Sequence, residues 1–317
     1  MRRRSVSVIV PAPELNDFGR RCVERLLALD EAPEVIVVTD RPEPDLDPRA
    51  VGVVCAGATS AKRQAGLERA GGELVALIDD DAYPHPSWLD VAASVLENPE
   101  IGAVCGPTLT PGDDAELERL SGRVFASPLV AGPHRWRYAP VEPRDVDDAP
   151  SVNLVVRRAD ALAAGFETPV RYGEDTIFCE RLRRSGLRIR YEPEAVVFHS
   201  RRPLWRRHAQ QVWRWSRRRG AFARAIGGNS LRPSYFAPTM LLAAAAAYPL
   251  TGGAARRGWW VAAGAYAAAC AAAAADRRPS RSLRLAGAIP LTHAVYGVGF
   301  LLGFAGVPLP EQREAGR

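Results

Sequence analysis

The sequence predicts an α/β fold built on a doubly wound, mostly parallel sheet and followed by a C-terminal helical region. Two observations predict the sheet: short β-branched runs alternate with segments of helical spacing, and these runs are apolar at nearly every position. Strands that are covered by helices on both faces have this unbroken apolar character. A third observation marks the helical region, because no Asp or Glu occurs from Arg201 to Ala275 and long uncharged stretches begin there.

The elements follow from these patterns in chain order. Strands are expected at 6–10, 35–38, 51–55 and 74–78, and helices at 17–29 and 60–70. On the first helix, Phe18, Cys22, Leu26 and Leu29 share one face. Further along we expect a helix at 84–96, a strand from 104, an irregular excursion at 112–146, a strand at 152–157, helices at 160–165 and 176–185, and a last strand at 196–198. The sequence therefore predicts a first domain over residues 1–200.

The region after residue 200 divides into a basic interfacial segment, 201–232, and a membrane region, 233–317. Nine arginines and three tryptophans lie between Arg201 and Arg224. Of three apolar stretches, 235–251 is short, whereas 258–275 and 285–309 are long enough to cross a hydrocarbon core of ~30 Å. Because alanine makes them weakly hydrophobic, hairpins lying on the membrane surface are the alternative. Two or three hydrophobic helices are thus expected at the inner or plasma membrane.

Charge and cysteine content place the first domain in the cytoplasm. With three crossings, the loop between the last two stretches is cytoplasmic, and its basic residues agree with the positive-inside rule. Arg256 and Arg257 would then lie outside, which counts against three crossings. The five cysteines are scattered without a C-x-x-C pair, which argues against a disulfide framework or a zinc site. The N-terminus lacks the long apolar core of a signal peptide.

Acidic residues follow two of the predicted strands. Asp40 ends the second strand, and Asp79–Asp81 end the fourth, so both are expected on the rim where doubly wound sheets bind ligands. Three adjacent carboxylates repel one another, and Mg²⁺ or Mn²⁺ would relieve this repulsion while holding a diphosphate. A solvated acidic turn is the alternative interpretation.

A second acidic pair, Glu174 and Asp175, follows Gly173 at the start of a predicted helix. An acid at this position caps the free N–H groups of a helix, which is the structural interpretation. The functional interpretation is a general base that takes a proton from a hydroxyl group.

Taken together, these patterns resemble the family 2 glycosyltransferases, which have a GT-A fold, the Rossmann-like fold of nucleotide-diphospho-sugar transferases. The matching residues, which span roughly 5–200, are Val6–Pro11, Ala61–Gly66, Leu77–Asp81 with Pro84–Leu89, Asn153–Leu154 with Arg157–Arg158, and Gly173–Asp175 followed by Arg181–Leu182. The resemblance implies transfer of a sugar from a nucleotide-sugar donor with inversion of configuration. It also implies that Asp81 binds the metal, together with Asp79 and His199, and that Asp175 is the catalytic base, with Glu174 beside it.

The resemblance further implies which residues hold the donor. Asp79 and Asp80 would contact the nucleotide, Arg63 the diphosphate, and Asp40 the nucleobase or ribose, with Pro11 beside them at the end of the first strand. The Asp-Gly-Ser that the family usually has at Asp40 is here Asp-Arg-Pro, which departs from the pattern.

The basic segment contains Gln211, Arg214 and Trp215, a match to the Q-x-x-R-W pattern of processive members, where it binds the donor diphosphate and the acceptor end. A basic, tryptophan-bearing helix on the membrane surface is the alternative. The chain resembles the ExoA-like group more closely, including His293 and the stretch after it.

The expected partners are a nucleotide-sugar donor, a lipid-linked or polysaccharide acceptor, and membrane lipids. A nucleotidyltransferase of similar fold is one rival, although residues 11–16 offer no glycine-rich phosphate loop. A non-catalytic nucleotide-sugar-binding membrane protein is another. Nucleic acid is not expected, because the arginines adjoin apolar segments and lipid phosphates are nearer.

Overall fold

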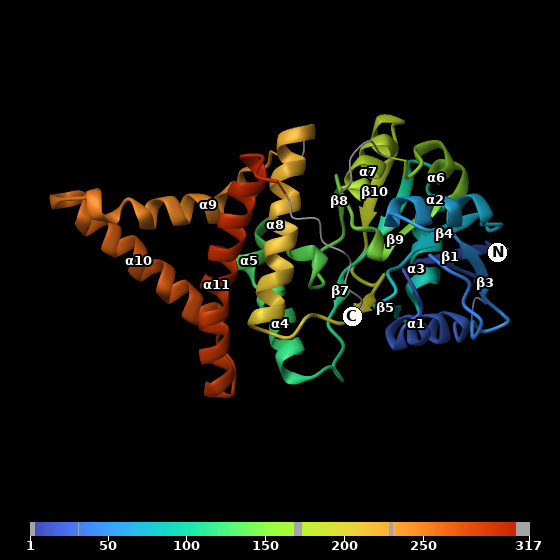
Figure 1. Cartoon of the computed structure of the whole chain (residues 1–317), viewed down its shortest axis with the longest axis horizontal. Coiled ribbons are helices and arrows are strands. Elements are labelled where there is room, and N and C mark those ends of the chain that lie inside the picture. The colour runs from blue at the N-terminus through green and yellow to red at the C-terminus, as the bar shows by residue number, and fades with distance from the viewer. Residues whose placement is uncertain (1–3, 31, 168–172, 228–230, 309–317) are drawn as a thin grey trace. The chain divides into compact units, whose positions relative to one another are not determined.

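The computed structural model describes residues 4–30, 32–167, 173–227 and 231–308 (Figure 1). The chain forms two compact units. The sheet unit comprises the residues up to Asp113 together with Trp136–Ser200, and the helical unit comprises Asp114–Arg135 together with the residues from Arg201 onward. The segment Asp114–Arg135 thus leaves the sheet unit, which the sequence did not indicate.

The sheet unit contains an eight-stranded sheet of order β3-β2-β1-β4-β9-β6-β10-β8. Its strands are β1 (Val6–Pro11), β2 (Glu34–Thr39), β3 (Val51–Val54), β4 (Leu74–Leu77), β6 (Ile101–Cys105), β8 (Arg144–Val146), β9 (Leu154–Arg157) and β10 (Arg188–Tyr191). Strands β3, β2, β1 and β4 are parallel, but β9 is antiparallel to both β4 and β6. The α/β class is confirmed, and the sheet is mixed where a mostly parallel one was expected.

Helices cover both faces of this sheet. Val8 and Val10 of β1 face the core that includes Cys22 of α1 (Asp17–Leu27) and Trp88 of α3 (Trp88–Val95). Ile9 faces the opposite core, to which α2 (Thr59–Arg69), α6 (Arg158–Ala164) and α7 (Glu174–Arg184) contribute. Alternate residues of one strand therefore fill two cores, which explains why the strands are apolar throughout.

Several expectations about individual elements were wrong in detail. Phe18 is 43% exposed, because the buried stripe of α1 is formed by Gly19, Cys22, Val23 and Leu26. The helix expected at 84–96 begins only at Trp88, after the short strand β5 (Ala82–Pro84). The excursion at 112–146 contains the helices α4 (Glu116–Ala126) and α5 (Pro128–Ala131), the 3-10 helix η1 (Gly132–Arg137) and β8.

A second, three-stranded sheet of order β5-β11-β7 lies in the same unit. Strand β11 (Val197–His199) is antiparallel to β5 and parallel to β7 (Thr108–Leu109). Its register pairs His199 with Ala82, the residue directly after the acidic run. This pairing brings together two segments that are far apart in the sequence.

The helical unit contains α4, α5, α8 (Arg206–Ile226), α9 (Pro233–Ala246), the 3-10 helix η4 (Tyr248–Leu250), α10 (Gly253–Ala273) and α11 (Pro279–Phe304). Within the described residues, α11 alone is long and apolar enough to cross a membrane, and 44% of its most apolar window is buried. The sequence predicted two or three such helices. The end of the predicted stretch 285–309 lies outside the described residues.

Candidate active site

The acidic run lies between the two sheets. Strand β4 ends at Leu77, and a turn leads into β5; the Ala82 N–H donates to the Asp79 carbonyl at 3.1 Å and closes this turn. Asp81 is buried, with 8% of its side chain exposed, and its Oδ1 lies 3.1 Å from Nε2 of His199. The pairing of β11 with β5 thus brings His199 to Asp81. The metal-binding role of both residues stays a prediction.

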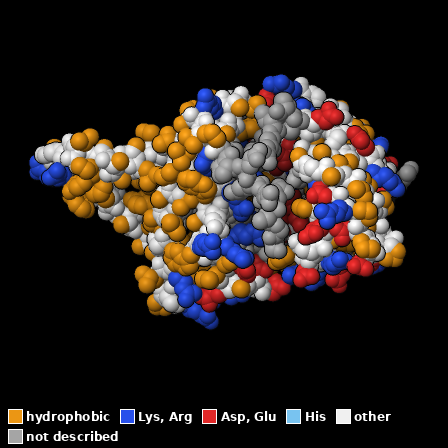
Figure 2. All heavy atoms as spheres, in the orientation of Figure 1, with side chains coloured by type: hydrophobic (Ala, Val, Ile, Leu, Met, Phe, Trp, Pro, Cys, Tyr) orange, Lys and Arg blue, Asp and Glu red, His pale blue; other side chains and the backbone are white. Residues whose placement is uncertain are grey.

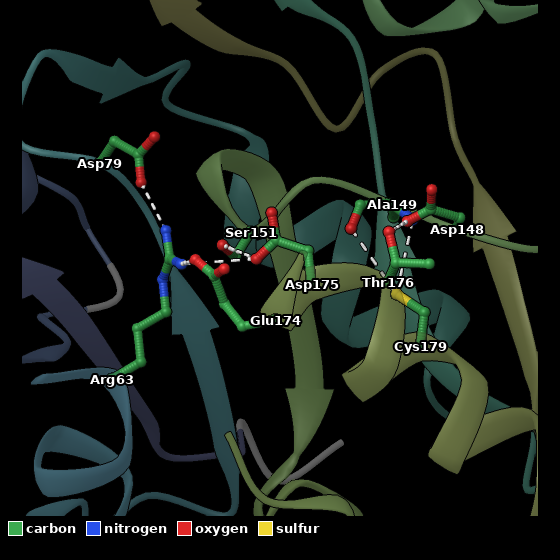
Figure 3. A network of polar contacts seen from close by, with 9 residues as sticks. All are labelled: Arg63, Asp79, Asp148, Ala149, Ser151, Glu174, Asp175, Thr176 and Cys179. Carbon is green, nitrogen blue, oxygen red and sulfur yellow. Dashed lines mark hydrogen bonds and ion pairs between the residues drawn. The ribbon is translucent and has the colours of Figure 1, made fainter. Parts of the chain in front are cut away.

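Asp79 lies at the other side of this turn and pairs with Arg63 of α2. The Arg63 Nη2 donates to Asp79 Oδ1 at 2.9 Å, while Nη1 donates to Glu174 Oε1 at 2.8 Å and to Asp175 Oδ1 at 3.4 Å (Figure 3). One guanidinium therefore links the acidic run to the acidic pair at the start of α7. Asp79, Arg63, Glu174 and Asp175 form one connected cluster, which we call the arginine-centred cluster.

Three side chains of the cluster have shifted pKa values. Burial alone would lower the pKa of Arg63, but the carboxylates of Asp175, Asp79 and Glu174 outweigh it and raise the pKa. Burial raises the pKa of Asp79, and Arg63 offsets only part of this effect. Burial and the neighbouring Asp175 likewise raise the pKa of Glu174. Such concentrations of perturbed carboxylates are typical of functional sites.

Glu174 and Asp175 occupy the first turn of α7, where the helix dipole favours negative charge. The N-cap is Gly173, whose φ of 90° is in the left-handed region that favours glycine. Gly173 has no side chain that could cap this N-terminus. The Glu174 carboxylate accepts a hydrogen bond from its own backbone N–H, so this acid satisfies a free N–H group of the first turn, as the structural interpretation expects.

Asp175 receives a second hydrogen bond that the sequence did not reveal. Ser151 Oγ, in the 3-10 turn η2 (Ser151–Asn153), donates to Asp175 Oδ1 at 2.6 Å. Thr176 and Cys179 of the same helix contact Asp148 and Ala149, so three contacts tie the first turns of α7 to residues 148–151 (Figure 3). Among the described residues, the hydrogen bonds to Asp175 converge on Oδ1, and the side chain is 28% exposed.

Asp40 and Pro11 lie at the ends of adjacent strands. Pro11 is the last residue of β1 and pairs with Val38 of β2, and the Asp40 N–H donates to the Pro13 carbonyl at 3.0 Å. Asp40 Oδ1 lies 2.5 Å from Nζ of Lys62, the chain's one lysine. The hydrogen bond from Lys62 lowers the pKa of Asp40. Lys62 was not among the predicted site residues, although it is the single lysine of the chain and its position next to Arg63 could have indicated a role at the site.

The remaining predicted residues lie elsewhere. Asp80 faces α1, since a methyl group on Gly19 would lie 3.8 Å from its Cβ. Gln211, Arg214 and Trp215 belong to α8 of the helical unit, where Gln211 is buried and the other two are exposed. Their roles, and those of Asp40 and Pro11 in donor binding, stay predictions.

Asn153, part of the resemblance, is structural. Its Oδ1 accepts from Trp88 Nε1 at 2.8 Å, and its Nδ2 donates to the carbonyls of Pro107 and Ala195. This buried amide thus joins α3 to the loops beside β7 and β11. It stabilises the frame that carries the acidic run and His199.

Comparison with known proteins agrees with this arrangement. Residues 57–158 match the family described as Glycosyl transferase family 2. The chain is 28% identical over 251 residues to the pre-mycofactocin glycosyltransferase of Mycobacterium tuberculosis, covering 75% of this chain and 50% of that protein. It is 24% identical over 145 residues to the glycosyltransferase AglE of Haloferax volcanii, covering 45% of each. The chain thus spans about half the length of the curated relatives it matches.

A solved structure shares the fold. The mannosyltransferase PcManGT of Pyrobaculum calidifontis, in complex with GDP-Man and Mn²⁺, superposes with a TM-score of 0.59 at 20% identity, covering 94% of this chain and 88% of that one. The fold is therefore GT-A-like. Together with the match over residues 57–158, this confirms the resemblance to the family 2 glycosyltransferases. The narrower ExoA-like grouping stays a prediction.

Proposed function

We propose that this chain is an inverting glycosyltransferase that moves a sugar from a nucleoside-diphosphate sugar to a hydroxyl group of a lipid-linked or polysaccharide acceptor. The observation that carries the proposal is the arginine-centred cluster. Arg63 joins the carboxylate of Asp79, at the carboxyl end of β4, to the acidic pair of α7. The same buried guanidinium of Arg63 thus contacts both the proposed donor-binding carboxylate and the proposed proton-accepting pair. The named relatives, both glycosyltransferases, support the same reaction class.

The residues present fit a divalent metal. Two adjacent ligands of an octahedral ion at about 2.1 Å are about 3 Å apart, close to the 3.1 Å between Asp81 Oδ1 and His199 Nε2. The described residues contain no group of three His, Cys, Asp or Glu side chains that would hold an ion alone. Mg²⁺ is usually held by one or two carboxylates plus substrate phosphates, so two protein ligands suffice. When bound, Mg²⁺ or Mn²⁺ would neutralise the diphosphate, as PcManGT, which holds GDP-Man and Mn²⁺, suggests.

Asp175 is the proposed general base. Ser151 and Arg63 hold its Oδ1, which leaves Oδ2 to accept the proton of the acceptor hydroxyl. The hydroxyl oxygen forms a bond to the anomeric carbon as the bond from that carbon to the diphosphate oxygen breaks. The nucleoside diphosphate leaves with the bonding electron pair, and the configuration inverts. Arg63 is the chain's own cation beside this reaction, and we assign it to the donor diphosphate.

The acceptor and location complete the proposal. The domain that carries the site acts at the cytoplasmic face of the inner or plasma membrane, and membrane lipids contact the helical unit. A lipid-linked sugar or growing polysaccharide would then meet the enzyme at high local concentration. Within the described residues, exposed apolar side chains of the helical unit, among them Leu250 and Val261, support membrane association.

The test is a panel of nucleotide sugars, each with Mg²⁺ or Mn²⁺ and with membranes present, read as nucleotide release. One donor should turn over. Asp81→Ala should abolish metal-dependent donor binding, whereas Asp175→Asn should keep donor binding in calorimetry and lose at least 100-fold in kcat. Asp45→Asn, at an 81%-exposed side chain, is the matched control and should leave both unchanged.

Three outcomes would contradict the proposal. A complete panel with neither turnover nor donor binding would remove the enzyme and its substrate class together. Donor binding without turnover in the unaltered chain would favour a non-catalytic nucleotide-sugar-binding protein. Release of pyrophosphate from a nucleoside triphosphate would favour a nucleotidyltransferase.

A further inference from the structure

Helix α11 passes the composition criterion for a membrane span but is packed along its length. It lies parallel to α8, and glycines bring the two backbones close together. A methyl group on Gly303 would lie 2.1 Å from the carbonyl oxygen of Arg217, and one on Gly299 would lie 2.0 Å from Ser216 Oγ. Such methyl groups would clash, so the two helices are in direct backbone contact. Any motion of α11 into a bilayer would therefore carry α8 with it.

Polar contacts tie α11 to the rest of the helical unit. Thr292 Oγ1 lies 2.9 Å from Nε2 of the buried His208 in α8, and His293 Nε2 lies 2.9 Å from the carbonyl of Leu129 in α5. The Arg217 Nη2 donates to the carbonyls of Val307 and Pro308, just after α11 ends. These bonds begin at the middle of α11 and continue past its C-terminus.

Helix α8 is unsuited to follow α11 into hydrocarbon. It contains seven arginines and no acidic residue, and Arg206, Arg207, Arg214 and Arg224 are exposed. Arginines near the centre of a bilayer are strongly unfavourable, and here they have no acidic partner on their own helix. Helix α11 is consequently a core helix of this unit rather than a crossing, although its composition allows one.

The exposed apolar surface lies instead on the hairpin formed by α9, η4 and α10. Its only charged residues are Arg256 and Arg257. Leu250 is 90% exposed and Val261 is 73% exposed. Figure 1 shows α9 and α10 meeting at a turn away from α8 and α11, and Figure 2 shows hydrophobic side chains over both arms. Helices that are apolar all round are buried in a protein core or in lipid, and among the described residues the turn of this hairpin belongs to none of the core clusters.

The turn of the hairpin has the composition of a membrane interface. The ring of Tyr248 lies 4.5 Å from that of Trp259 and 5.6 Å from that of Trp260, and the Arg256 guanidinium lies 5.3 Å from the Tyr248 centroid. Tryptophan and tyrosine gather at the headgroup level of a membrane, and arginine extends its charge to lipid phosphates. The free part of α10 before Tyr266, which packs on α11, is about 20 Å long and is too short to cross ~30 Å of hydrocarbon.

We infer that the α9–η4–α10 hairpin lies in one leaflet of an anionic bilayer, with its aromatic turn and Arg256 and Arg257 at the level of the lipid phosphates. Helix α11 does not cross the membrane. The protein is held at one membrane face by the hairpin, in the manner of interfacial helices. This inference does not depend on the proposed activity, so the two fail independently.

The experiment is flotation of the full chain with vesicles of phosphatidylcholine and phosphatidylglycerol. The double variant Leu250→Asp with Val261→Asp should lower partitioning at least 30-fold. The matched double variant Val298→Asp with Leu301→Asp, at exposed apolar positions of α11, should stay within about threefold. All four positions are at least 43% exposed, so neither variant removes a core contact, and circular dichroism checks that each folds.

Two further measurements use the turn itself. Replacing Arg256 and Arg257 with Gln should weaken binding to the anionic vesicles about fivefold for each arginine, with little effect on pure phosphatidylcholine. The fluorescence of Trp260 is the part of the emission that Trp260→Phe removes. Lipids brominated near the headgroup should quench this fluorescence more strongly than lipids brominated near the chain ends. Loss of flotation in the α11 variant but not the hairpin variant would overturn the inference. Stronger quenching by lipids brominated near the chain ends would also overturn it. The same holds if the hairpin variant changes self-association and leaves flotation unchanged.

Discussion

The arginine-centred cluster depends on one side chain, and its removal has a calculable effect on stability. Arg63 is 6% exposed and contacts Asp79, Glu174 and Asp175 at 2.9, 2.8 and 3.4 Å. Removing one partner of a buried ion pair costs about 3–5 kcal/mol, because the remaining charge is left without compensation. The three carboxylates keep 33, 18 and 28% of their side-chain exposure, so water replaces part of the lost contact. We therefore expect Arg63→Met to lower the unfolding free energy of the sheet unit by about 3 kcal/mol.

The assay should report on the sheet unit alone. Cys22, Cys105 and Cys179 are buried there, so their labelling at increasing urea, followed by mass spectrometry, measures opening of this unit. Arg69→Met is the control, because it lies on the same helix but is 53% exposed and contacts only Glu34, at 3.4 Å. Its effect should stay below about 1 kcal/mol. Equal effects of the two variants, or a loss below 1 kcal/mol for Arg63→Met, would refute the assignment of Arg63 as the cluster's central charge.

Three further predictions concern other contacts. Ser151→Ala should lower kcat about tenfold, because Asp175 loses the hydrogen bond that holds its Oδ1, and Ser151→Thr should restore part of the rate. An unchanged kcat in Ser151→Ala would leave Ser151 a purely structural role. Burial lowers the pKa of His208 to about 4, so the full stability is present above about pH 6.5, where the residue is neutral in both the folded and the unfolded chain. About 3 kcal/mol of the unfolding free energy is lost as the pH falls to about 4. In urea titrations, His208→Leu should remove this dependence of the unfolding free energy on pH, and an identical dependence in the variant would contradict the assignment. Gly303→Ala should destabilise the helical unit by about 1–3 kcal/mol, because the added methyl group meets the Arg217 carbonyl. Gly264→Ala, with open space around it, should stabilise its helix by about 0.5–1 kcal/mol. Thermal melts measure both effects, and effects of the same sign would contradict the close packing at Gly303.

The strands and the positions of the acids were predictable because they depend on local composition. The runs at β1, β2, β3 and β4 are apolar at most positions, and the acids lie directly or one residue beyond the ends of β2 and β4. Strand β10 was missed because its sequence, Arg-Ile-Arg-Tyr, alternates over only four residues. Helix α4 was missed because its apolar residues are sparse among charged ones, and its partners are helices far along the chain.

The contacts within the candidate site were less predictable, since they depend on tertiary register. His199 reaches Asp81 because β11 pairs with β5, a strand of three residues that the sequence analysis did not foresee. Ser151 reaches Asp175 because the expected strand at 152–157 begins as the 3-10 turn η2. No pattern in the sequence gives that change of geometry.

The acidic run itself shows how neighbouring residues acquire different surroundings. The sequence argument treated Asp79–Asp81 as three repelling charges that a single cation would relieve. In the fold, Asp79 pairs with Arg63, Asp80 faces α1, and Asp81 lies beside His199. The protein therefore supplies a cation of its own for the first acid, whereas the third lies beside His199. For the metal that we propose to arrive with the donor, Asp81 and His199 are the predicted ligands, and Arg63 links Asp79 to the proposed base Asp175.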